Sequence, residues 1–458
     1  MRAFARQMTE RMKAVAAGGA VAAFWLAVWV FATALVAQPL ILPGPGAVVV
    51  ALLQLVCDAG TWAILAGSGA RILGGLALAA VCGGVLAGVS VRSRTFARLV
   101  APALSFVKAT PVACVVVLLL IWLGSARVSI AAVFLMALPG VYFSLVEGLT
   151  QADGPLEQMF RLHGVRGWRL FCAHTWREVL PFVLSCARAV IGMSWKAGVA
   201  AELIGMAAGT VGARIYQAKL LIETADLLAW TVLVVAASWA CERVLVWLLR
   251  ASGPAAWRIA VRAHGRGLRG RTGAASDGAA AELALAVGDR APWAPALDGL
   301  ALRVPAGGRT CVMGASGVGK SSLLALAAGE CVPCSMVFQD VRLVEGASAL
   351  DNVLVCADAR VDASSAAALL RLLVPGIDVH ARVAELSGGQ RRRVEIARAL
   401  LCPGDAVILD EPFTGLDTAA RDTCAEVVLD LLDGRMLLLA THDSADARAL
   451  NISDIITL

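Results

Sequence analysis

A glycine-rich segment lies between an apolar run and a helical pattern in the C-terminal third of the chain. Its residues are Gly314, Ala315, Ser316, Gly317, Val318, Gly319, Lys320 and Ser321, followed by Ser322. Glycines let successive backbone N–H groups surround a phosphate, and the following helix N-terminus adds partial positive charge. A lysine here reaches the β- and γ-phosphates, and the next hydroxyl binds Mg²⁺. The order of strand, loop, lysine, hydroxyl and helix predicts a P-loop for ATP and Mg²⁺, and it disfavours a glycine-rich turn that binds nothing.

Two carboxylates end a later apolar run. The run "DAVILDEP" spans residues 405–412 and ends with Asp410 and Glu411 near its last position. An acid at the end of a parallel strand beside a P-loop can bind Mg²⁺, and the next acid can polarise an attacking water. Acidic residues also end strands for solubility, so the pattern is weak by itself. With the P-loop it predicts Asp410 as a metal ligand and Glu411 as a catalytic base.

A second glycine motif, "LSGGQ", lies at residues 386–390 before an expected helix. Glycines after a serine suit close approach of the backbone to an anion at a helix N-terminus. The alternative is a helix cap followed by a solvated basic face. We interpret the serine and glycines as an anion site, and the arginines Arg391, Arg392 and Arg393 as a solvated face.

The composition of the chain indicates a membrane protein. Of 458 residues, 59% are hydrophobic and 16% are charged, with a mean hydropathy of +0.76. Soluble proteins of this length are usually far less apolar. The apolar excess predicts a membrane domain at 1–249, a basic Gly- and Ala-rich linker at 250–281, and a domain of ordinary charge density at 282–458.

Runs of about 20 apolar residues can cross a bilayer as helices. We predict six spans, at 14–36, 71–91, 110–123, 128–147, 180–203 and 228–249. Lys and Arg gather in the segments that would lie on one side, which places both termini in the cytoplasm. The pattern therefore predicts a multi-pass protein of the cell (inner or cytoplasmic) membrane, in contact with lipid.

Charges and cysteines fit this membrane assignment. The net charge of +6 is an argument for membrane topology, because Lys and Arg are concentrated on one side of the membrane. No basic motif with interleaved aromatics indicates nucleic-acid binding. Lys196 and Glu202 lie inside a predicted span, where they either line a solute path or form structural pairs. The twelve cysteines are scattered among apolar neighbours and are expected to be reduced. Only Cys331 and Cys334 have redox or metal spacing, and no second pair lies nearby.

A charged segment between the fourth and fifth spans has helical periodicity. It reads "GPLEQMFRLHGVRGWRLFCAHTWREVLP" and contains Gly164, with Leu180-Pro181 at its end. With "LPGPGAVVVALLQL" near residue 41, it resembles the binding-protein-dependent ABC permeases of the nitrate/sulfonate/taurine type, over roughly 41–249. The resemblance makes the loop around Gly164 the coupling loop that contacts an ATPase. Gln158-Met159-Phe160 stands where that family has Glu-Ala-Ala, so the contact is expected to be reshaped.

The C-terminal domain resembles the ABC ATPases. Its "LSGGQ" motif precedes the Asp410-Glu411 strand, and "VFQD", "GLD" and "THD" supply Gln339, Asp417 and His442 in the family's order. Only 18 residues separate Lys320 from Gln339, so this domain is shorter than usual. No residue of the phosphate chemistry is missing.

The ABC resemblance also implies a role for each motif. The signature loop would face the γ-phosphate held by the P-loop of a second copy, through Ser387, Gly388, Gly389 and Gln390. Gln339 would sense Mg²⁺ and the attacking water, His442 would contact the γ-phosphate, and Asp417 would lie in the D-loop at the dimer interface. Trp293 would stack on adenine, or else pack in the core.

These patterns predict a multi-domain protein, with an α-helical transmembrane bundle of about six spans followed by an α/β P-loop NTPase (ABC nucleotide-binding) domain. One permease half and one ATPase half per chain predict a symmetric homodimer. ATP hydrolysis would drive uptake of a small solute delivered by a separate extracytoplasmic solute-binding protein. The alternatives are a half-transporter exporter, and a membrane-anchored ATPase that moves no solute.

Overall fold

The computed structural model describes residues 2–263, 283–286, 300–331 and 333–458, and the side chains from residue 17 onward except residue 18. The chain divides into two units. Unit 1 consists of Met1–Gln151 and Val179–Arg250, and unit 2 of Ala152–Glu178 and Ala251–Leu458. The segment Ala152–Glu178, which contains the expected coupling loop, thus belongs to the same unit as the C-terminal domain.

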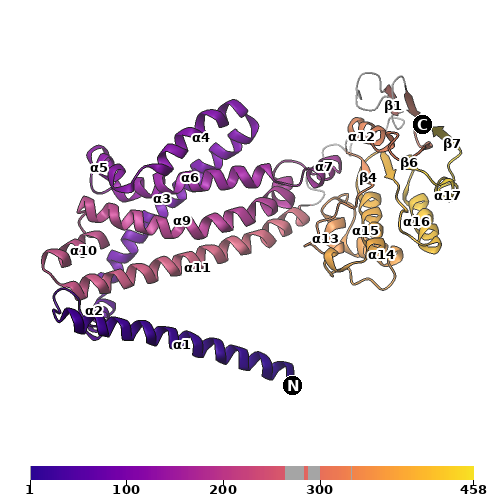
Figure 1. Ribbon diagram of the computed structural model, residues 1–458. Coiled ribbons are helices and arrows are strands. Elements are labelled where there is room, and N and C mark those ends of the chain that lie inside the picture. Colours follow the sequence, from indigo (N-terminus) through magenta and orange to yellow (C-terminus); the bar gives the residue numbers. More distant parts are fainter. Residues whose placement is uncertain (1, 264–282, 287–299, 332) are drawn as a thin grey trace. The chain divides into compact units, whose positions relative to one another are not determined.

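The regular secondary structure among the described residues of unit 1 is entirely helical (Figure 1). Two of these helices continue into unit 2, α9 at its beginning and α11 at its end. The helices are α1 (Arg2–Val36), α2 (Pro45–Cys57), α3 (Ala59–Arg92), α4 (Arg94–Ala109), α5 (Val112–Leu123), α6 (Val128–Thr150), α9 (Trp176–Gly205), α10 (Val211–Leu220) and α11 (Thr224–Arg262).

Five helical stretches among the described residues are long and apolar enough to cross a membrane. They are Gly19–Val36, Ala59–Arg92, Val128–Thr150, Gly167–Gly205 and Thr224–Arg262. A sixth crossing is possible if α4 and α5, which meet at an angle of 103°, together form one broken span. The predicted third span at 110–123 is therefore not a straight helix, because the 12 residues of α5 are too short to cross a bilayer alone.

Small residues let the helices of unit 1 approach closely. A Cβ added to Gly75 of α3 would lie 2.5 Å from the carbonyl oxygen of Ile130 in α6. A Cβ added to Gly198 of α9 would lie 2.5 Å from a side-chain carbon of Ile72 in α3. Helices in lipid associate largely through such packing of small residues. The glycines therefore specify the contacts of α3 with α6 and α9.

Unit 2 combines short helices with two sheets. Before its strands, the chain contributes α7 (Gly154–Leu162), α8 (Gly167–Leu170) and a π-helical turn (Phe171–Thr175). The strands are β1 (Leu283–Ala286), β2 (Ala301–Val304), β3 (Arg309–Met313), β4 (Ser335–Val337), β5 (Ala406–Asp410), β6 (Met436–Thr441) and β7 (Asp454–Thr457). The later helices are α12 (Lys320–Glu330), α13 (Ala349–Leu354), α14 (Ala363–Leu373), a 3₁₀ turn (Val383–Glu385), α15 (Gly388–Leu401), α16 (Thr418–Leu431) and α17 (Ser444–Ala449).

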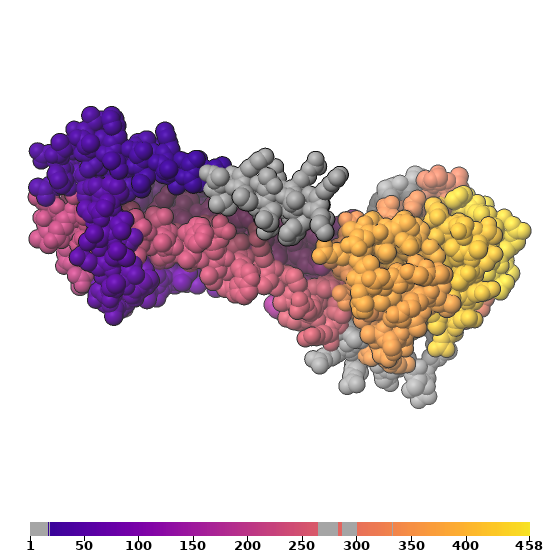
Figure 2. All heavy atoms as spheres, turned by 90° about the horizontal axis from the view of Figure 1, so that it is seen from below, coloured from indigo at the N-terminus to yellow at the C-terminus, as the bar shows by residue number. Residues whose placement is uncertain are grey.

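A parallel five-stranded sheet forms the centre of unit 2, in the order β4-β5-β6-β3-β7. Every residue of β5 and β6 is buried, as expected of strands covered on both faces. Helix α12 packs against alternate strand residues on one face, and α14, α15 and α16 pack on the other. In Figure 2 the residues from α13 onward, orange to yellow, form one continuous body. The expected α/β domain after a helical membrane domain is confirmed.

Candidate nucleotide site

The carboxyl ends of three neighbouring parallel strands bring the predicted site residues to one edge of the sheet. Strand β3 leads into the P-loop, β5 ends at Asp410, and β6 ends at Thr441. Because β5, β6 and β3 are adjacent and parallel, the loops that follow them meet at this edge. The site is thus assembled by topology from segments about 30 to 130 residues apart in sequence.

The P-loop curls around its own lysine. Gly317 and Gly319 have φ values of +85° and +108°, which side chains other than glycine rarely adopt. Lys320, the first residue of α12, is 6% exposed, and its Nζ donates hydrogen bonds to the carbonyl oxygens of Gly314 (2.7 Å) and Ala315 (3.0 Å). The loop therefore has the backbone path that the glycines predicted, with an ammonium at the helix N-terminus.

Three oxygen donors beside the P-loop fit a magnesium ion. The Ser321 hydroxyl lies 3.5 Å from Oε1 of Gln339. Asp410 is 3% exposed, and its Oδ1 has no hydrogen-bond partner among the described residues. Burial raises the pKa of Asp410, and a hydrogen bond from Ser321 opposes this rise. A buried carboxylate oxygen without a partner, next to a hydroxyl and an amide oxygen, is a donor set that Mg²⁺ prefers.

Glu411 and His442 form a pair at the ends of β5 and β6. The Nδ1 of His442 lies 3.2 Å from Oε1 of Glu411, and Thr414 Oγ1 donates to Oε2 at 3.5 Å. The backbone of Glu411 has a φ of +45°, and its N–H donates to the Ala440 carbonyl at 2.9 Å. This backbone conformation is costly for a residue other than glycine, and it recurs at catalytic positions. The contact of Thr414 with Glu411 has no signal in the sequence, because it depends on the fold of the loop.

Ser387 caps helix α15. Its hydroxyl accepts a hydrogen bond from the Gln390 N–H at 3.3 Å, and the Gln390 side chain accepts one from the Ser387 N–H at 2.9 Å. This reciprocal pair is a capping box. Gly388 is exposed and Gly389 is partly exposed, so backbone at the positive end of this 14-residue helix remains accessible. The cap and the anion site are therefore compatible on the same segment.

The prediction that the three arginines after the signature form a solvated face is wrong. Arg391 is partly buried and donates to the carbonyl oxygens of Leu386 (3.0 Å) and Ala384 (2.9 Å). Arg393 donates to the Gly389 carbonyl at 3.2 Å and to the Leu373 carbonyl at 2.9 Å. These side chains hold loop carbonyls around the signature, because a guanidinium can bind several acceptors at once.

Arg392 is buried and connects α15 to the loop that carries Gln339. Its guanidinium donates to the carbonyl oxygens of Phe338 and Gln339. It also pairs with Glu395 at 2.9 Å, and Glu395 pairs with Arg398 at 3.3 Å. Glu395 and Arg398 have no exposed surface. This cluster has no signal in the sequence, because only the fold shows that these charges are buried.

The remaining predicted site residues are placed as follows. Asp417 is the N-cap of α16, and its side chain accepts a hydrogen bond from the Ala420 N–H at 2.8 Å. Gly164 follows α7 with a φ of +79° and allows the turn toward α8. Trp293 lies outside the described residues, as does the linker from residue 264 to its end.

Glu202 and Lys196, the charged residues expected inside one predicted span, have different surroundings. Glu202 has no exposed surface, and it accepts from Arg71 Nε at 3.0 Å and from Ser68 Oγ at 2.8 Å, which makes it a structural pair. Lys196 of α9 and Glu242 of α11 instead line a cavity of about 660 Å³ in unit 1. Charges within a membrane usually face a water-filled path or another protein surface.

The twelve cysteines form no disulfide in the structure. Cys334 is buried, and burial raises the pKa of its thiol to about 12. Burial disfavours the thiolate form of Cys334, which is the nucleophilic form.

The fold and the site together define a P-loop nucleotide-binding domain joined to a helical membrane domain. Residues 80–258 match the family described as "Binding-protein-dependent transport system inner membrane component". Residues 297–414 match the family described as "ABC transporter". The chain is therefore an ABC transporter protein in which a permease domain is fused to an ABC ATPase domain.

Curated relatives match parts of the ATPase domain. The taurine import ATP-binding protein TauB of Pseudomonas aeruginosa is 38% identical over 130 residues, 27% of this chain and 49% of the relative. The aliphatic sulfonates import ATP-binding protein SsuB of Corynebacterium glutamicum is 38% identical over 125 residues, 25% and 51% of the two chains. The macrolide export ATP-binding/permease protein MacB of Psychrobacter cryohalolentis is 36% identical over 126 residues, 26% and 19%. The chain thus spans about half or less of the length of these relatives.

Among solved structures, the dimeric structure of MJ0796, a bacterial ABC transporter cassette, is similar to this chain. It has 24% sequence identity and a TM-score of 0.33, over 36% of this chain and 86% of that chain. The family assignment rests on the two matches at residues 80–258 and 297–414.

Proposed function

We propose that this chain hydrolyses Mg-ATP and uses the reaction to move a small solute across the cell membrane, in the direction of uptake. The observation that carries the proposal is the meeting of the P-loop with Asp410, Glu411 and His442 at one sheet edge. The chain also contains a region that matches a permease family. An ATPase site and a permease in one chain are the parts that a transporter needs.

In this mechanism Lys320 exchanges its loop carbonyl partners for the β- and γ-phosphates of ATP. Glu411 accepts a proton from the attacking water, and His442 orients Glu411 and contacts the γ-phosphate. Ser321, Gln339 and Asp410 would hold Mg²⁺, which when bound neutralises charge on the phosphates. The carboxylate of Glu411 lies 3.2 Å from Nδ1 of His442, at the same edge of the sheet as the P-loop.

A second copy of the chain would complete the site. The exposed N-terminus of α15 presents Ser387 and Gly388 to solvent, where they can bind an anion that another copy carries. Two such chains, closing head to tail, would hold two ATP molecules with each signature loop facing the other copy's P-loop. We therefore propose a homodimer, with Asp417 close to its interface.

The permease match supports the proposed direction of transport and the proposed partner. Its family description names a binding-protein-dependent system, which supports uptake from a separate extracytoplasmic solute-binding protein. Both import and export proteins occur among the ATPase relatives, so the ATPase domain does not favour either direction. We propose that both termini lie in the cytoplasm, because Lys and Arg are concentrated in the segments on that side.

The catalytic proposal is tested by Glu411→Gln in the purified full chain. Loss of a general base lowers turnover by about 10²- to 10⁴-fold, whereas ATP binding should remain because the P-loop is unchanged. Glu426→Gln is the matched control, since Glu426 is an exposed carboxylate on α16. Unchanged turnover in the Glu411 variant would contradict the assigned role.

Reconstituted vesicles test the transport proposal. ATP-driven accumulation of a solute that requires a separate binding protein would support uptake. Accumulation that needs no binding protein and runs in the opposite direction would identify an exporter. A third outcome is ATP hydrolysis without flux of any solute that is bound by the binding proteins encoded in neighbouring genes. That result would favour a membrane-anchored ATPase that moves no solute.

A further inference from the structure

We infer that Arg392 and Glu395 of α15 are positioning residues for Gln339, which lies in the metal site proposed above. The inference rests on that proposed site and goes beyond it, because it assigns neither residue a contact with ATP or Mg²⁺. Gln339 lies in the loop after β4, residues 338–342, which we name the Gln339 loop. Side chains of α15 hold this loop from both of its ends.

The Gln339 loop has little support from other backbone groups. Outside the helices and strands, the backbone–backbone hydrogen bonds of the described residues include none from residues 339–342. Gln339 itself is exposed, so burial does not fix its side chain. A metal ligand has to be held in place by the groups around it. The support for Gln339 must therefore come from side chains.

Arg392 holds the peptide groups on both sides of Gln339. Its Nη1 donates a hydrogen bond to the carbonyl oxygen of Phe338, and its Nη2 donates one to the carbonyl oxygen of Gln339 itself. Because peptide groups are planar, only the two backbone dihedrals of Gln339 separate these two carbonyls. The guanidinium therefore restricts the direction in which the Gln339 side chain leaves the backbone, toward the Ser321 hydroxyl at 3.5 Å.

Glu395 holds both Arg392 and the far end of the same loop. Its Oε2 lies 2.9 Å from Nη1 of Arg392, and its Oε1 accepts a hydrogen bond from the Arg342 N–H at 3.2 Å. Arg398 pairs with Glu395 at 3.3 Å and donates to the Arg342 carbonyl. All three side chains from α15 are buried. Charge-assisted hydrogen bonds in such surroundings are strong and geometrically specific.

The charge of Arg392 also acts on the carboxylate of the proposed metal site. Burial raises the pKa of Asp410. A hydrogen bond from Ser321, and then the charges of Lys320 and Arg392, act in the opposite direction on this pKa. Arg392 thus favours the ionised form of Asp410, which is the form that binds a metal ion. A substitution that keeps the charge at residue 392 separates its hydrogen bonds from this electrostatic effect.

The same helix carries the signature at its N-terminus. Ser387 is the N-cap of α15, and Arg392 follows within its first two turns. A rigid helix can carry a displacement from one end to groups that are held farther along it. The position of Gln339 is therefore tied to the helix that would face the partner's ATP in the proposed homodimer.

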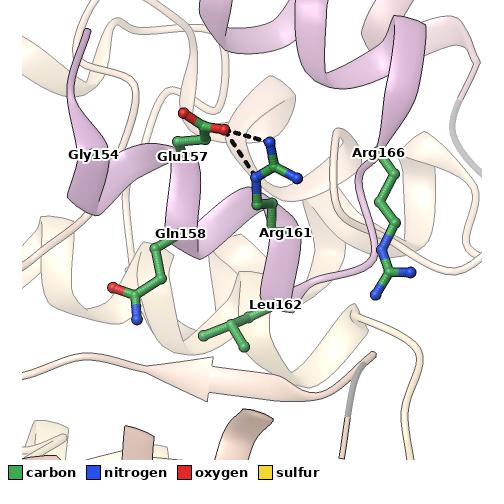
Figure 3. Close-up of a pocket in the computed structure, with 6 residues that line it drawn as sticks. All are labelled: Gly154, Glu157, Gln158, Arg161, Leu162 and Arg166. Atoms are coloured by element: carbon green, nitrogen blue, oxygen red, sulfur yellow. Dashed lines mark hydrogen bonds and ion pairs between the residues drawn. The ribbon is translucent and has the colours of Figure 1, made fainter. Parts of the chain in front are cut away.

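The side chain of Arg342 has contacts outside the Gln339 loop, so its substitution is a poor test. It donates to Oε1 of Gln158 at 3.1 Å and to the Pro155 carbonyl at 3.2 Å. Both acceptors belong to α7 in the coupling segment, Ala152–Glu178, and Figure 3 shows the Gln158 side chain projecting from α7. A change at Arg342 would therefore disturb α7 as well as the loop.

Arg392→Lys in the purified full chain tests the inference. Lysine keeps the charge, but a single ammonium replaces the planar guanidinium that fits two acceptors. The measured quantity is the dissociation constant of the non-hydrolysable β,γ-imido analogue of ATP, in excess Mg²⁺ and again in excess EDTA. We expect the constant in Mg²⁺ to rise about 10-fold, because groups that orient a metal ligand affect metal affinity by roughly 10- to 100-fold. The constant in EDTA should stay the same.

Two further variants make the comparison specific. Arg371→Lys is the matched control, since Arg371 is exposed on α14, and it should change neither constant. Gln339→Ala should weaken binding in Mg²⁺, and addition of Arg392→Lys to it should weaken binding no further, because the positioned side chain is already absent. Additive losses would overturn the inference, and so would an Arg392→Lys chain with the wild-type ratio of the two constants.

Hydrogen exchange distinguishes a local change from unfolding. In Arg392→Lys, peptides that cover residues 338–342 should exchange faster, whereas those of the buried strands β5 and β6 should keep their protection. If exchange rises throughout the domain, the comparison is repeated with Glu395→Gln, which keeps an acceptor for the Arg342 N–H. A loop that exchanges at the wild-type rate in both variants, or general unfolding in both, would refute a positioning role.

The outcomes separate this inference from the proposed function. A wild-type chain that binds the analogue equally well in Mg²⁺ and in EDTA would contradict the proposed metal site. Hydrogen exchange would then still show whether Arg392 holds the Gln339 loop. A wild-type chain that prefers Mg²⁺, with the same preference in Arg392→Lys, would leave the metal site standing and remove the role assigned to Arg392.

Discussion

Replacing Phe160 by alanine should destabilise unit 2. Phe160 has no exposed surface and lies in the core that the coupling segment shares with the nucleotide-binding domain. Truncating a buried phenylalanine costs about 3–5 kcal/mol, because apolar contacts are lost and the cavity fills only partly. For unit 2, whose two segments Ala152–Glu178 and Ala251–Leu458 together have 235 residues, this lowers the melting temperature by about 6–20 °C.

The measurement is thermal unfolding of the purified full chain in detergent, followed by protease resistance of the C-terminal fragment at each temperature. Trp168→Ala is the matched control, since it removes a larger aromatic side chain from the same segment at a position that is 68% exposed. We expect the control to change stability by about 1 kcal/mol or less. Equal melting temperatures for the two variants would refute the hydrophobic core that the coupling segment shares with the nucleotide-binding domain.

Three further predictions concern the site and its support. Glu395→Ala leaves two buried guanidinium groups without their carboxylate and should cost about 3–5 kcal/mol in thermal or urea unfolding, whereas Glu426→Ala on the surface of α16 should be nearly neutral. Gly317→Ala should weaken ATP binding in a filter or fluorescence assay because of its φ of +85°, and Gly329→Ala, in open space on α12, should not. The pKa of His163 is lowered from its ordinary 6.5 to about 3, mainly by burial and then by the charge of Arg398. As the pH falls, the unfolded chain therefore binds a proton at this residue before the folded chain does. The free energy of unfolding consequently decreases as the pH drops below 6.5. The loss should reach about 2 kcal/mol at pH 5, and a His163→Gln chain that kept the same acid sensitivity would contradict this account.

The site could be predicted from sequence where its chemistry lies in contiguous residues. The P-loop is a strand, a glycine loop and a helix in direct succession, so Lys320 and Ser321 could be placed before any fold was known. Asp410 and Glu411 followed from an apolar strand that ends in two acids. In each case the backbone geometry that the chemistry needs is specified by neighbouring residues.

Other features depend on contacts between distant segments. Arg392 was expected in solvent, yet it lies against the Phe338 and Gln339 carbonyls, more than 50 residues earlier in the chain. A run of arginines has the same sequence pattern whether its partners are water or loop carbonyls. The break between α4 and α5 was also missed, although Pro111 stands at the start of α5 and disfavours a helical residue before it.

The burial of Phe160 and Phe338 in one hydrophobic core has a consequence for biosynthesis. The ribosome makes the second aromatic roughly 180 residues after the first, on the order of 10–40 s later at ordinary elongation rates. During that interval the apolar face around Phe160 has no companion strands to cover it, while the membrane helices after it are still being inserted. Newly made chains are therefore most prone to aggregation and to chaperone capture at this stage, and truncation after the last membrane helix would make that vulnerable state permanent.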